Sequence, residues 1–349
     1  MQFKIPPRLQ KGDRVAIISP SAGLPSVFPW VYELGLQRLR DLFHLEPVEF
    51  PTARKSPDYL AKNPQARADD INAAFADPSI KAIIATIGGN DQMRILPYLD
   101  AKTITSHPKS FLGYSDNTNL HLYLWNLGIT SYYGGHLMNQ FAMQGHMHDF
   151  TVQYLRKALF EQSIGEIHSS PEWTDYDLNW DDPQNNTQSR PMYPSDGWHW
   201  HNHENKILEG RLWGGCLEVL DLHLSVRRHL PPLDRLTGTI LFLETSEEMP
   251  TEGFVYRFLA ALGELGILHK LKAILFGRSK AQFCGKFPTE GREMFIANQQ
   301  RAVKRALQDY DCHLPVIFNL NFGHTDPQVI IPSGGIAIID GVKKTIRFR

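Results

Sequence analysis

A serine between an apolar strand and a helix is the residue best placed to act as a nucleophile. Ser115 lies in residues 113–118, Gly-Tyr-Ser-Asp-Asn-Thr, and the apolar segment 110–113 precedes it. The leucines at 120, 124 and 127 fall on one helical face. A sharp turn between strand and helix exposes a serine hydroxyl, as in a nucleophile elbow, although the pattern is not Gly-x-Ser-x-Gly. Ser115 or Asp116 could equally be only a helix N-cap, since both residue types are favoured there.

A second turn, Gly88-Gly89-Asn90, follows an apolar strand predicted over residues 82–87 and precedes another predicted helix. Two glycines let backbone N–H groups approach a ligand closely, which suits an oxyanion hole. A tight turn that binds nothing is the simpler interpretation, and the turn alone favours it.

A carboxylate and a histidine in the second half of the chain complete a possible hydrolytic set. Glu244 ends an apolar strand predicted over residues 239–244, where it could hold an imidazole or belong to a solvated acidic cluster with Glu247, Glu248 and Glu252. His324 lies in a turn between apolar strands. Gly323 before it and Pro327 after it restrict the backbone, which makes His324 the best candidate for a base.

A metal centre is the alternative that the histidines allow. His199, His201 and His203 would share one face of an extended segment and could bind zinc. Because no Asp, Glu or Cys stands close by at ligand spacing, we favour an exposed polar hairpin there, and we expect neither a metal nor an organic cofactor.

The composition excludes several classes of partner. The 349 residues carry 36 Lys and Arg against 37 Asp and Glu, so no basic excess is available for a nucleic acid polymer. No apolar run has the roughly 18 residues of a membrane helix, and the first residues have no apolar signal segment. Three cysteines are too few and too far apart for a disulfide framework, which favours the cytoplasm.

The elements that must position these residues alternate in the first 160 residues. Apolar strands are predicted over 14–18, 82–87 and 110–113, and helices near 31–42 and 64–76. Another predicted helix contains Met93, Leu96 and Leu99, and a further one follows Asp116 and ends at Gly128. Such alternation predicts a parallel sheet covered by helices, with sites in the loops beyond the carboxyl ends of the strands.

The second half differs in character. Residues 171–205 combine turn formers with four tryptophans (Trp173, Trp180, Trp198 and Trp200), which predicts a long functional loop rather than plain disorder. After residue 210 come apolar strands over 239–244 and 273–277, and alternating ones over 329–332 and 335–339.

These segments together resemble the LD-carboxypeptidase family of serine peptidases, and more closely its microcin C immunity branch. The matching motifs run in order from about residue 12 to 340. They are Ser-Pro-Ser-Ala-Gly at 19–23, Gly-Gly at 88–89, residues 113–118, Tyr-Gly-Gly at 133–135, Gly-Arg-Leu-Trp-Gly-Gly at 210–215, Leu-Phe-Leu-Glu at 241–244 and Phe-Gly-His-Thr at 322–325.

The resemblance implies a catalytic triad of Ser115, His324 and Glu244. It also implies an oxyanion hole formed by the backbone N–H groups of Gly89 and Asp116. A triad is recognised by geometry and role rather than by chain order, so the order Ser, Glu, His is acceptable.

The resemblance also implies an α/β fold with two domains, usually in a homodimer. The N-terminal domain, residues 1–168, would be a flavodoxin-like or glutamine-amidotransferase-like parallel-sheet domain that carries the nucleophile. An aromatic inter-domain loop would span 169–206. A smaller C-terminal β-rich α/β domain, residues 207–349, would carry the Glu and His of the triad.

Likeness to the immunity branch depends on the aromatic loop, because in those proteins an aromatic side chain there stacks on the nucleotide base. It implies that Gly88, Asn90, Trp180 and Trp198 contact the substrate, a small peptide or peptidyl-nucleotide. Two departures put the substrate in question: the loop is rich in Gln and Asn, and Cys216 stands where many members have Asn.

Three alternatives stay open. The enzyme could be a murein tetrapeptide LD-carboxypeptidase of cell-wall recycling instead of cleaving peptidyl- or aminoacyl-nucleotides. It could be a non-catalytic binding protein on the same scaffold, or a zinc hydrolase that uses the three histidines.

Overall fold

The computed structural model describes residues 2–203 and 207–349 and divides into two compact units. The first comprises Met1–Ser163, Leu178–Ser189 and Ile330–Gly334, and the second comprises Ile164–Asp177, Arg190–Val329 and Gly335–Arg349. The boundaries expected from the sequence, after residues 168 and 206, stay a prediction. Residues 204–206, at the end of the expected loop, lie outside the described part of the chain.

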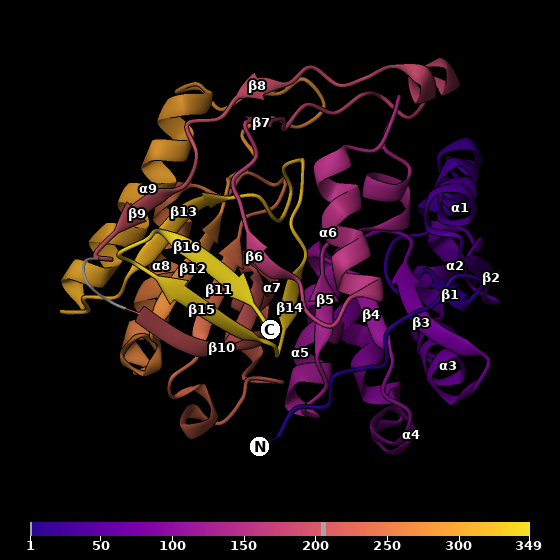
Figure 1. Ribbon diagram of the computed structural model, residues 1–349, viewed down its shortest axis with the longest axis horizontal. Helices are drawn as coiled ribbons and strands as arrows, with labels where there is room; N and C mark the ends of the chain where they lie inside the picture. The colour runs from indigo at the N-terminus through magenta and orange to yellow at the C-terminus, as the bar shows by residue number, and fades with distance from the viewer. Residues whose placement is uncertain (1, 204–206) are drawn as a thin grey trace. The chain divides into compact units, whose positions relative to one another are not determined.

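The first unit is built on a sheet of six strands in the order β14-β5-β4-β3-β1-β2 (Figure 1). Strands β1 to β5 pair in parallel, and β14 is antiparallel to β5. Their bounds are β1 Arg14–Ile18, β2 Glu46–Glu49, β3 Ile80–Ala85, β4 Ser110–Gly113, β5 Ser131–Tyr133 and β14 Ile331–Ser333.

Helices connect these strands, as the alternation in the sequence predicts. They are α1 Pro29–Phe43, α2 Pro57–Lys62, α3 Pro64–Ala76, α4 Ala101–Ser106, α5 Thr118–Asn126 and α6 Asp149–Phe160. Short 3₁₀ turns cover Leu24–Ser26, Gln92–Tyr98, Ser115–Asn117 and Pro183–Thr187, and a π-helical turn covers Leu137–Phe141.

One face of the sheet is packed by a continuous apolar cluster. Ile18 of β1, Ile83 of β3 and Phe111 of β4 meet residues of α3 and α5 there, including Phe75 and Leu120. Since burying a side chain of this size stabilises the fold by about 1.5–3 kcal/mol, the cluster fixes β4 and α5 firmly. The turn between them carries Ser115.

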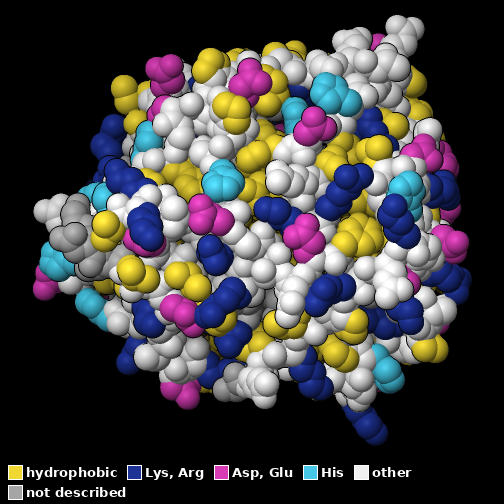
Figure 2. Space-filling view, in the orientation of Figure 1, with side chains coloured by type: hydrophobic (Ala, Val, Ile, Leu, Met, Phe, Trp, Pro, Cys, Tyr) yellow, Lys and Arg dark blue, Asp and Glu magenta, His cyan; other side chains and the backbone are white. Residues whose placement is uncertain are grey.

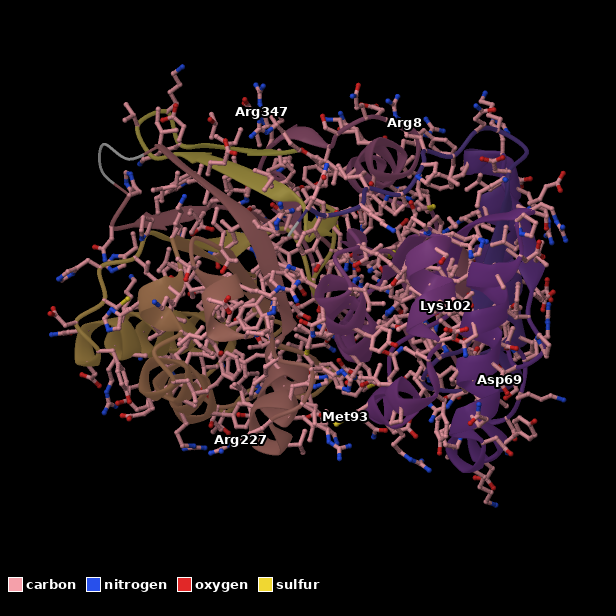
Figure 3. The ribbon with its side chains drawn as sticks, turned by 90° about the horizontal axis from the view of Figure 1, so that it is seen from below. Arg8, Asp69, Met93, Lys102, Arg227 and Arg347 are labelled. Carbon is pink, nitrogen blue, oxygen red and sulfur yellow. The ribbon has the colours of Figure 1, made fainter. Side chains whose placement is uncertain are left out.

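Helix α3 shows how the polar residues are divided between surface and interior. Asp69 is exposed (Figure 3). Arg67 and Asp70 of the same helix are buried. The two guanidinium NH groups of Arg67 contact the carboxylate of Asp91 at 2.7 and 3.0 Å. This buried charge is therefore paired, as buried charges must be.

The second unit contains a mixed sheet of eight strands in the order β6-β16-β15-β10-β11-β12-β13-β9. Strands β10 to β13 are parallel, and the remaining pairings are antiparallel. The bounds are β6 Gly165–Ile167, β9 His199–His201, β10 Ile207–Cys216, β11 Ile240–Glu244, β12 Ala273–Gly277, β13 Val316–Leu320, β15 Ile336–Asp340 and β16 Thr345–Phe348.

Three helices accompany this sheet, and α8 packs against α9. Their bounds are α7 Leu217–Val226, α8 Glu252–Glu264 and α9 Arg292–Asp309, with 3₁₀ turns at Leu233–Leu236 and Leu268–Lys270. The middle strand β11 is fully buried along its length, including Glu244. A buried carboxylate at the end of a buried strand needs a partner, and this requirement points to the site.

Two expectations from the sequence need correction. The helix expected around Met93, Leu96 and Leu99 is a 3₁₀ helix, Gln92–Tyr98, with Pro97 inside it. Proline cannot donate the hydrogen bond that an α-helix requires, so the shorter turn replaces it. The region expected to be a loop, 171–205, also contains the strands β7 Glu172–Trp173, β8 Tyr193–Pro194 and β9, which pairs with β13.

The surface fits the near-zero net charge. On the face in Figure 2, Lys and Arg side chains are interspersed with Asp and Glu. Within residues 2–203 and 207–349, no helix has the length and hydropathy that a membrane span requires.

Candidate active site

Ser115 occupies a strained turn directly after β4. Its φ is 59°, in the left-handed region that non-glycine residues seldom adopt. Its N–H donates to the hydroxyl of Tyr133 at 3.1 Å, and a 3₁₀ turn and α5 follow at once. Strain of this kind costs roughly 1–3 kcal/mol and persists where the surroundings enforce it, often at functional sites. The expected turn between strand and helix is present.

The turn at Gly88 leaves space for the serine. A Cβ at residue 88 would lie 2.9 Å from Ser115 Oγ and 3.5 Å from the backbone nitrogen of Asp116. Residue 88 is therefore glycine because the hydroxyl and this amide lie against it. The exposed Gly89 and Asn90 follow. The structure thus places Gly88 against Ser115 and the Asp116 amide, and Gly89 against Ser21.

The carboxylate of Asp116 organises the loops around the serine. Asp116 Oδ2 accepts hydrogen bonds from the hydroxyl of Ser21 and from the N–H groups of Asp91 (3.1 Å) and Gln92 (3.0 Å). Burial raises the pKa of Asp116, and the bonds from Ser21 and Gln92 oppose this shift. The same residue that offers its N–H beside Ser115 thus fixes the chain after Gly89.

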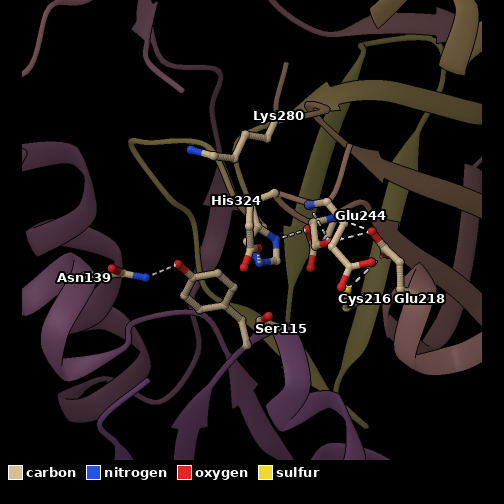
Figure 4. A network of polar contacts seen from close by, with 12 residues as sticks. Ser115, Asn139, Cys216, Glu218, Glu244, Lys280 and His324 are labelled. Carbon is tan, nitrogen blue, oxygen red and sulfur yellow. Dashed lines mark hydrogen bonds and ion pairs between the residues drawn. The ribbon is translucent and has the colours of Figure 1, made fainter. Parts of the chain in front are cut away.

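Sequence reasoning missed a polar network behind the serine. His136 Nε2 accepts from the N–H of Tyr114 at 3.0 Å, and the two rings stack with centroids 4.0 Å apart. Asn139 Nδ2 donates to the Tyr114 hydroxyl at 2.8 Å (Figure 4). The motifs at 19–23 and 133–135 pointed to Ser21 and Tyr133, but His136 carried no such signal.

The second unit contains the predicted acid–base pair. Glu244 at the end of β11 and His324 approach with Oε2 and Nδ1 2.7 Å apart (Figure 4). The Glu244 side chain is 0% exposed and that of His324 is 8% exposed. Gly323, with φ 92°, provides the room, because a Cβ there would lie 2.6 Å from Glu244 Oε2. Glu244 can therefore hold one tautomer of the ring.

A further carboxylate lies at the other ring nitrogen, and sequence reasoning did not identify its role. Glu247 Oε2 is 3.0 Å from His324 Nε2. Burial lowers the pKa of His324, but Glu244 and Glu247 outweigh burial and raise it well above the ordinary value. The imidazolium is thus stabilised from both sides.

A third acidic residue supports the strand end that carries Glu244. Glu218 Oε1 accepts from the N–H of Ser246 at 2.9 Å and from its hydroxyl at 2.6 Å, and Cys216 Sγ donates to Glu218 Oε2 at 3.2 Å (Figure 4). Burial, together with Glu218 and Glu244, raises the pKa of Cys216 well above its ordinary value, so it stays a thiol. A buried thiol of this kind is inert.

The tryptophans of the aromatic loop have different surroundings. In the first unit the half-buried Trp180 packs edge-to-face on Phe28, with centroids 5.5 Å apart, and its carbonyl accepts from Trp30 Nε1 at 2.9 Å. In the second unit Trp198 Nε1 donates to Asn321 at 3.2 Å, and Trp173 is buried under Arg278. Trp173 is therefore a packing residue.

Two of the three histidines considered for zinc contact other groups. His199 Nε2 contacts Asp196 Oδ2 at 2.5 Å, and His203 Nδ1 donates to the carbonyl of Gly341 at 2.9 Å. In the part of the chain that the structure describes, no group of three or more His, Cys, Asp or Glu side chains could hold a metal ion.

These parts define a class of protein. A strained serine beside a glycine turn and a buried carboxylate–imidazole pair are the components of hydrolases that use a serine nucleophile.

The comparisons with known proteins specify the family. Residues 15–134 match the LD-carboxypeptidase N-terminal domain and residues 209–339 match the LD-carboxypeptidase C-terminal domain. The protein YocD of Bacillus subtilis (strain 168), which has a provisional name as a carboxypeptidase, is 30% identical over 97% of both chains. The chain belongs to the LD-carboxypeptidase family and is a serine peptidase, a hydrolase.

Immunity proteins are among its relatives. The microcin C7 self-immunity protein MccF of Escherichia coli is 27% identical over 97% of this chain and 93% of that protein. An MccF-like protein from Streptococcus pneumoniae, solved in complex with AMP, superimposes with a TM-score of 0.84 at 30% identity and covers 97% of this chain and 99% of its own. The fold predicted from the sequence is confirmed.

Proposed function

We propose that Ser115, His324 and Glu244 form a catalytic triad that hydrolyses the acyl bond of peptidyl- or aminoacyl-nucleotides. The observation that carries the proposal is the buried contact of 2.7 Å between Glu244 and His324, since it keeps Nδ1 protonated and orients the ring, with Nε2 as the nitrogen that would take the serine proton. The left-handed turn at Ser115 supports the choice of nucleophile.

The proposed chemistry is acyl transfer to water. Ser115 Oγ bonds to the substrate's carbonyl carbon while its proton passes to His324 Nε2, and the leaving atom takes that proton as its bond to carbon breaks. A water then attacks the acyl-enzyme and gives its proton to Nε2, and Ser115 regains a proton as the carboxylate product leaves.

Backbone N–H groups would stabilise the oxyanion. Those of Gly89 and Asp116 are the candidates. The Asp116 nitrogen and the Ser115 hydroxyl both lie against Gly88, since a Cβ there would be 3.5 Å from the first and 2.9 Å from the second. Donors fixed before the reaction stabilise a developing charge without reorganising, and one such donor is worth about a hundredfold or more in rate.

The likeness to an MccF-like protein solved with AMP supports a nucleotide in the leaving group. Trp180 and Trp198 are half-buried and offer flat π-faces that a murein peptide could not use. The proposed contacts of Gly88 and Asn90 with substrate follow from their place beside the serine turn.

A double-mutant cycle tests the triad. Ser115→Ala, His324→Ala and the double variant should lose about the same activity on an aminoacyl-sulfamoyl adenosine, because members of one triad act as a unit. Multiplicative losses would show that the two residues act separately. A murein tetrapeptide assayed in parallel distinguishes the cell-wall alternative, and activity that survives EDTA argues against zinc at His199, His201 and His203.

The homodimer and the cytoplasmic location are also proposals, and they rest on the family resemblance and on the few cysteines. Sedimentation equilibrium of the purified chain would test the dimer directly.

A further inference from the structure

The carboxylate of Glu247 occupies the nitrogen that a catalytic histidine needs for its work. Glu247 Oε2 lies 3.0 Å from His324 Nε2, while Nδ1 is held by Glu244. A base must accept a proton at Nε2. An imidazole between two carboxylates instead holds protons on both nitrogens, so this arrangement is a resting state of the ring.

Besides His324, the cation near Glu247 is Lys280, which helps to lower the pKa of Glu247 but forms its ion pair with Asp177. The nearby Lys280 donates to the carbonyl of Asp175 at 2.9 Å and to Asp177 Oδ1 at 3.0 Å, so its charge is already paired. Burial raises the pKa of Cys284 most, and the negative charge of Glu247 is among the charges that raise it further. For Glu247, the contact with His324 is the one ion pair among the described residues.

Glu247 is also accessible enough to meet a substrate. Its side chain is 39% exposed, compared with 0% for Glu244. Its Oε2 is shielded from solvent and faces His324 Nε2. A shielded carboxylate oxygen of this kind gains from an incoming N–H donor, because hydrogen bonds to charged groups are the strong ones.

We propose that Glu247 is a specificity-determining residue that binds the free α-ammonium group of an aminoacyl substrate. This inference rests on the proposed function and names the acyl half of the substrate. Binding of the ammonium would pair the charge of Glu247 and free Nε2 of His324 for the serine proton.

The geometry of acyl transfer brings the two groups together. Reacting atoms approach to about 3–3.5 Å, and the α-nitrogen is two bonds from the carbonyl carbon under attack. An α-ammonium group therefore lies within a few ångströms of Nε2, where Glu247 Oε2 already is. An acylated amine or an inner peptide bond offers no positive charge at this position.

The proton balance agrees with this sequence of events. Burial raises the pKa of Glu247, but the charge of His324 prevails and holds it at about 2, so the carboxylate is ionised and can receive an ammonium. When the ammonium pairs with Glu247, one of the two anions that raise the pKa of His324 is neutralised. The imidazolium then releases its Nε2 proton to water, and the base becomes competent.

A matched pair of substrates tests the proposal. Alanyl-sulfamoyl adenosine and its N-acetyl derivative share the nucleotide and the scissile carbonyl and differ in the ammonium. The wild-type enzyme should prefer the free amine by about tenfold or more in kcat/KM. Glu247→Gln should reduce this preference to within about threefold, and the acid limb of its pH profile should move to lower pH. The exposed neighbour gives the control Glu248→Gln, which should keep the wild-type preference.

Binding measurements test the role of Glu247 independently of whether the enzyme hydrolyses the substrate. In the Ser115→Ala background, calorimetry should find tighter binding of the free-amine compound, and the added Glu247→Gln change should remove the difference, whether or not either compound is hydrolysed. Equal affinities in the Ser115→Ala protein, or a preference that survives Glu247→Gln, would overturn the role of Glu247. Loss of hydrolysis of both compounds by the wild-type enzyme, with the binding difference intact, would overturn only the proposed reaction.

Discussion

The serine turn and the acid–histidine cluster are built by different means. Around Ser115 the backbone dominates: a left-handed residue, a glycine that leaves space and N–H groups held by the carboxylate of Asp116. Around His324 side-chain charge dominates, with Glu244 and Glu247 on the ring and Glu218 behind them. The first region fixes the position of the Ser115 hydroxyl, and the second controls the protonation of the His324 ring.

This difference predicts how substitutions in each region should affect activity and its pH dependence. Changes at the serine turn should remove the reaction or displace its atoms, with little dependence on pH. Changes in the acid–histidine cluster should alter the proton affinity of His324, so their effects should depend strongly on pH.

The largest expected effect is at Ser115, where two substitutions should lower activity alike but differ in their effect on stability. Ser115→Gly and Ser115→Ala should both lower kcat by several orders of magnitude. Glycine tolerates φ 59° without strain, whereas alanine does not, so the Gly variant should be more stable than the Ala variant by about 1 kcal/mol. Kinetics and thermal unfolding measure both. A more stable Ala variant would contradict the strained turn.

The next effect is at Glu244. Glu244→Gln keeps the size of the side chain but removes the charge that stabilises the imidazolium, so kcat should fall far more than KM rises. The pKa of His324 should also fall, because one of the two groups that raise it loses its charge. Steady-state kinetics across pH would measure both effects. A change limited to KM would place Glu244 in substrate binding.

Gly88→Ala probes the backbone region without replacing a reacting group. The added methyl group would lie 2.9 Å from Ser115 Oγ, so the hydroxyl must shift. Since small displacements of reacting groups can cost about a hundredfold in rate, we expect a loss of that order in kcat with the pH profile unchanged. Gly253→Ala, where the nearest atom is the flexible end of Arg257 at 3.4 Å, is the matched control. A loss in both variants would point to general destabilisation.

The same difference explains what could be predicted from the sequence. The turn at 113–118 and the glycine pair at 88–89 are local patterns, because backbone geometry restricts which residues fit. The alternation of strands and helices likewise indicated the parallel sheet of the first unit. The apolar spacing of Met93, Leu96 and Leu99 predicts an α-helix, but Pro97 lies inside the segment and the structure has a 3₁₀ helix there.

The acid–histidine cluster could be predicted from the sequence only in part. Context and family resemblance indicate Glu244 and His324, but the sequence around Glu247 is typical of a solvated acidic cluster, and nothing in the sequence marks Glu218. Their roles depend on tertiary contacts between β11, α7 and the turn at His324, which no local pattern encodes. The strands β7 and β8 were missed for a similar reason, since a two-residue strand is defined by its partner.

The smallest expected effect is the loss of affinity for the nucleotide base when Trp180 of the first unit or Trp198 of the second is replaced. Stacking of a base on an aromatic ring is worth about 1–3 kcal/mol, or roughly tenfold to a hundredfold in affinity. If nucleotide recognition is correct, Trp180→Ala or Trp198→Ala should weaken hydrolysis of an aminoacyl-nucleotide analogue about tenfold and affect a plain tetrapeptide much less. Trp180 packs on Phe28 in the first unit and Trp198 donates to Asn321 in the second, so the sensitive variant also tells which region binds the base. Equal losses on both substrates would indicate packing, with Trp173→Ala as the reference for a buried tryptophan.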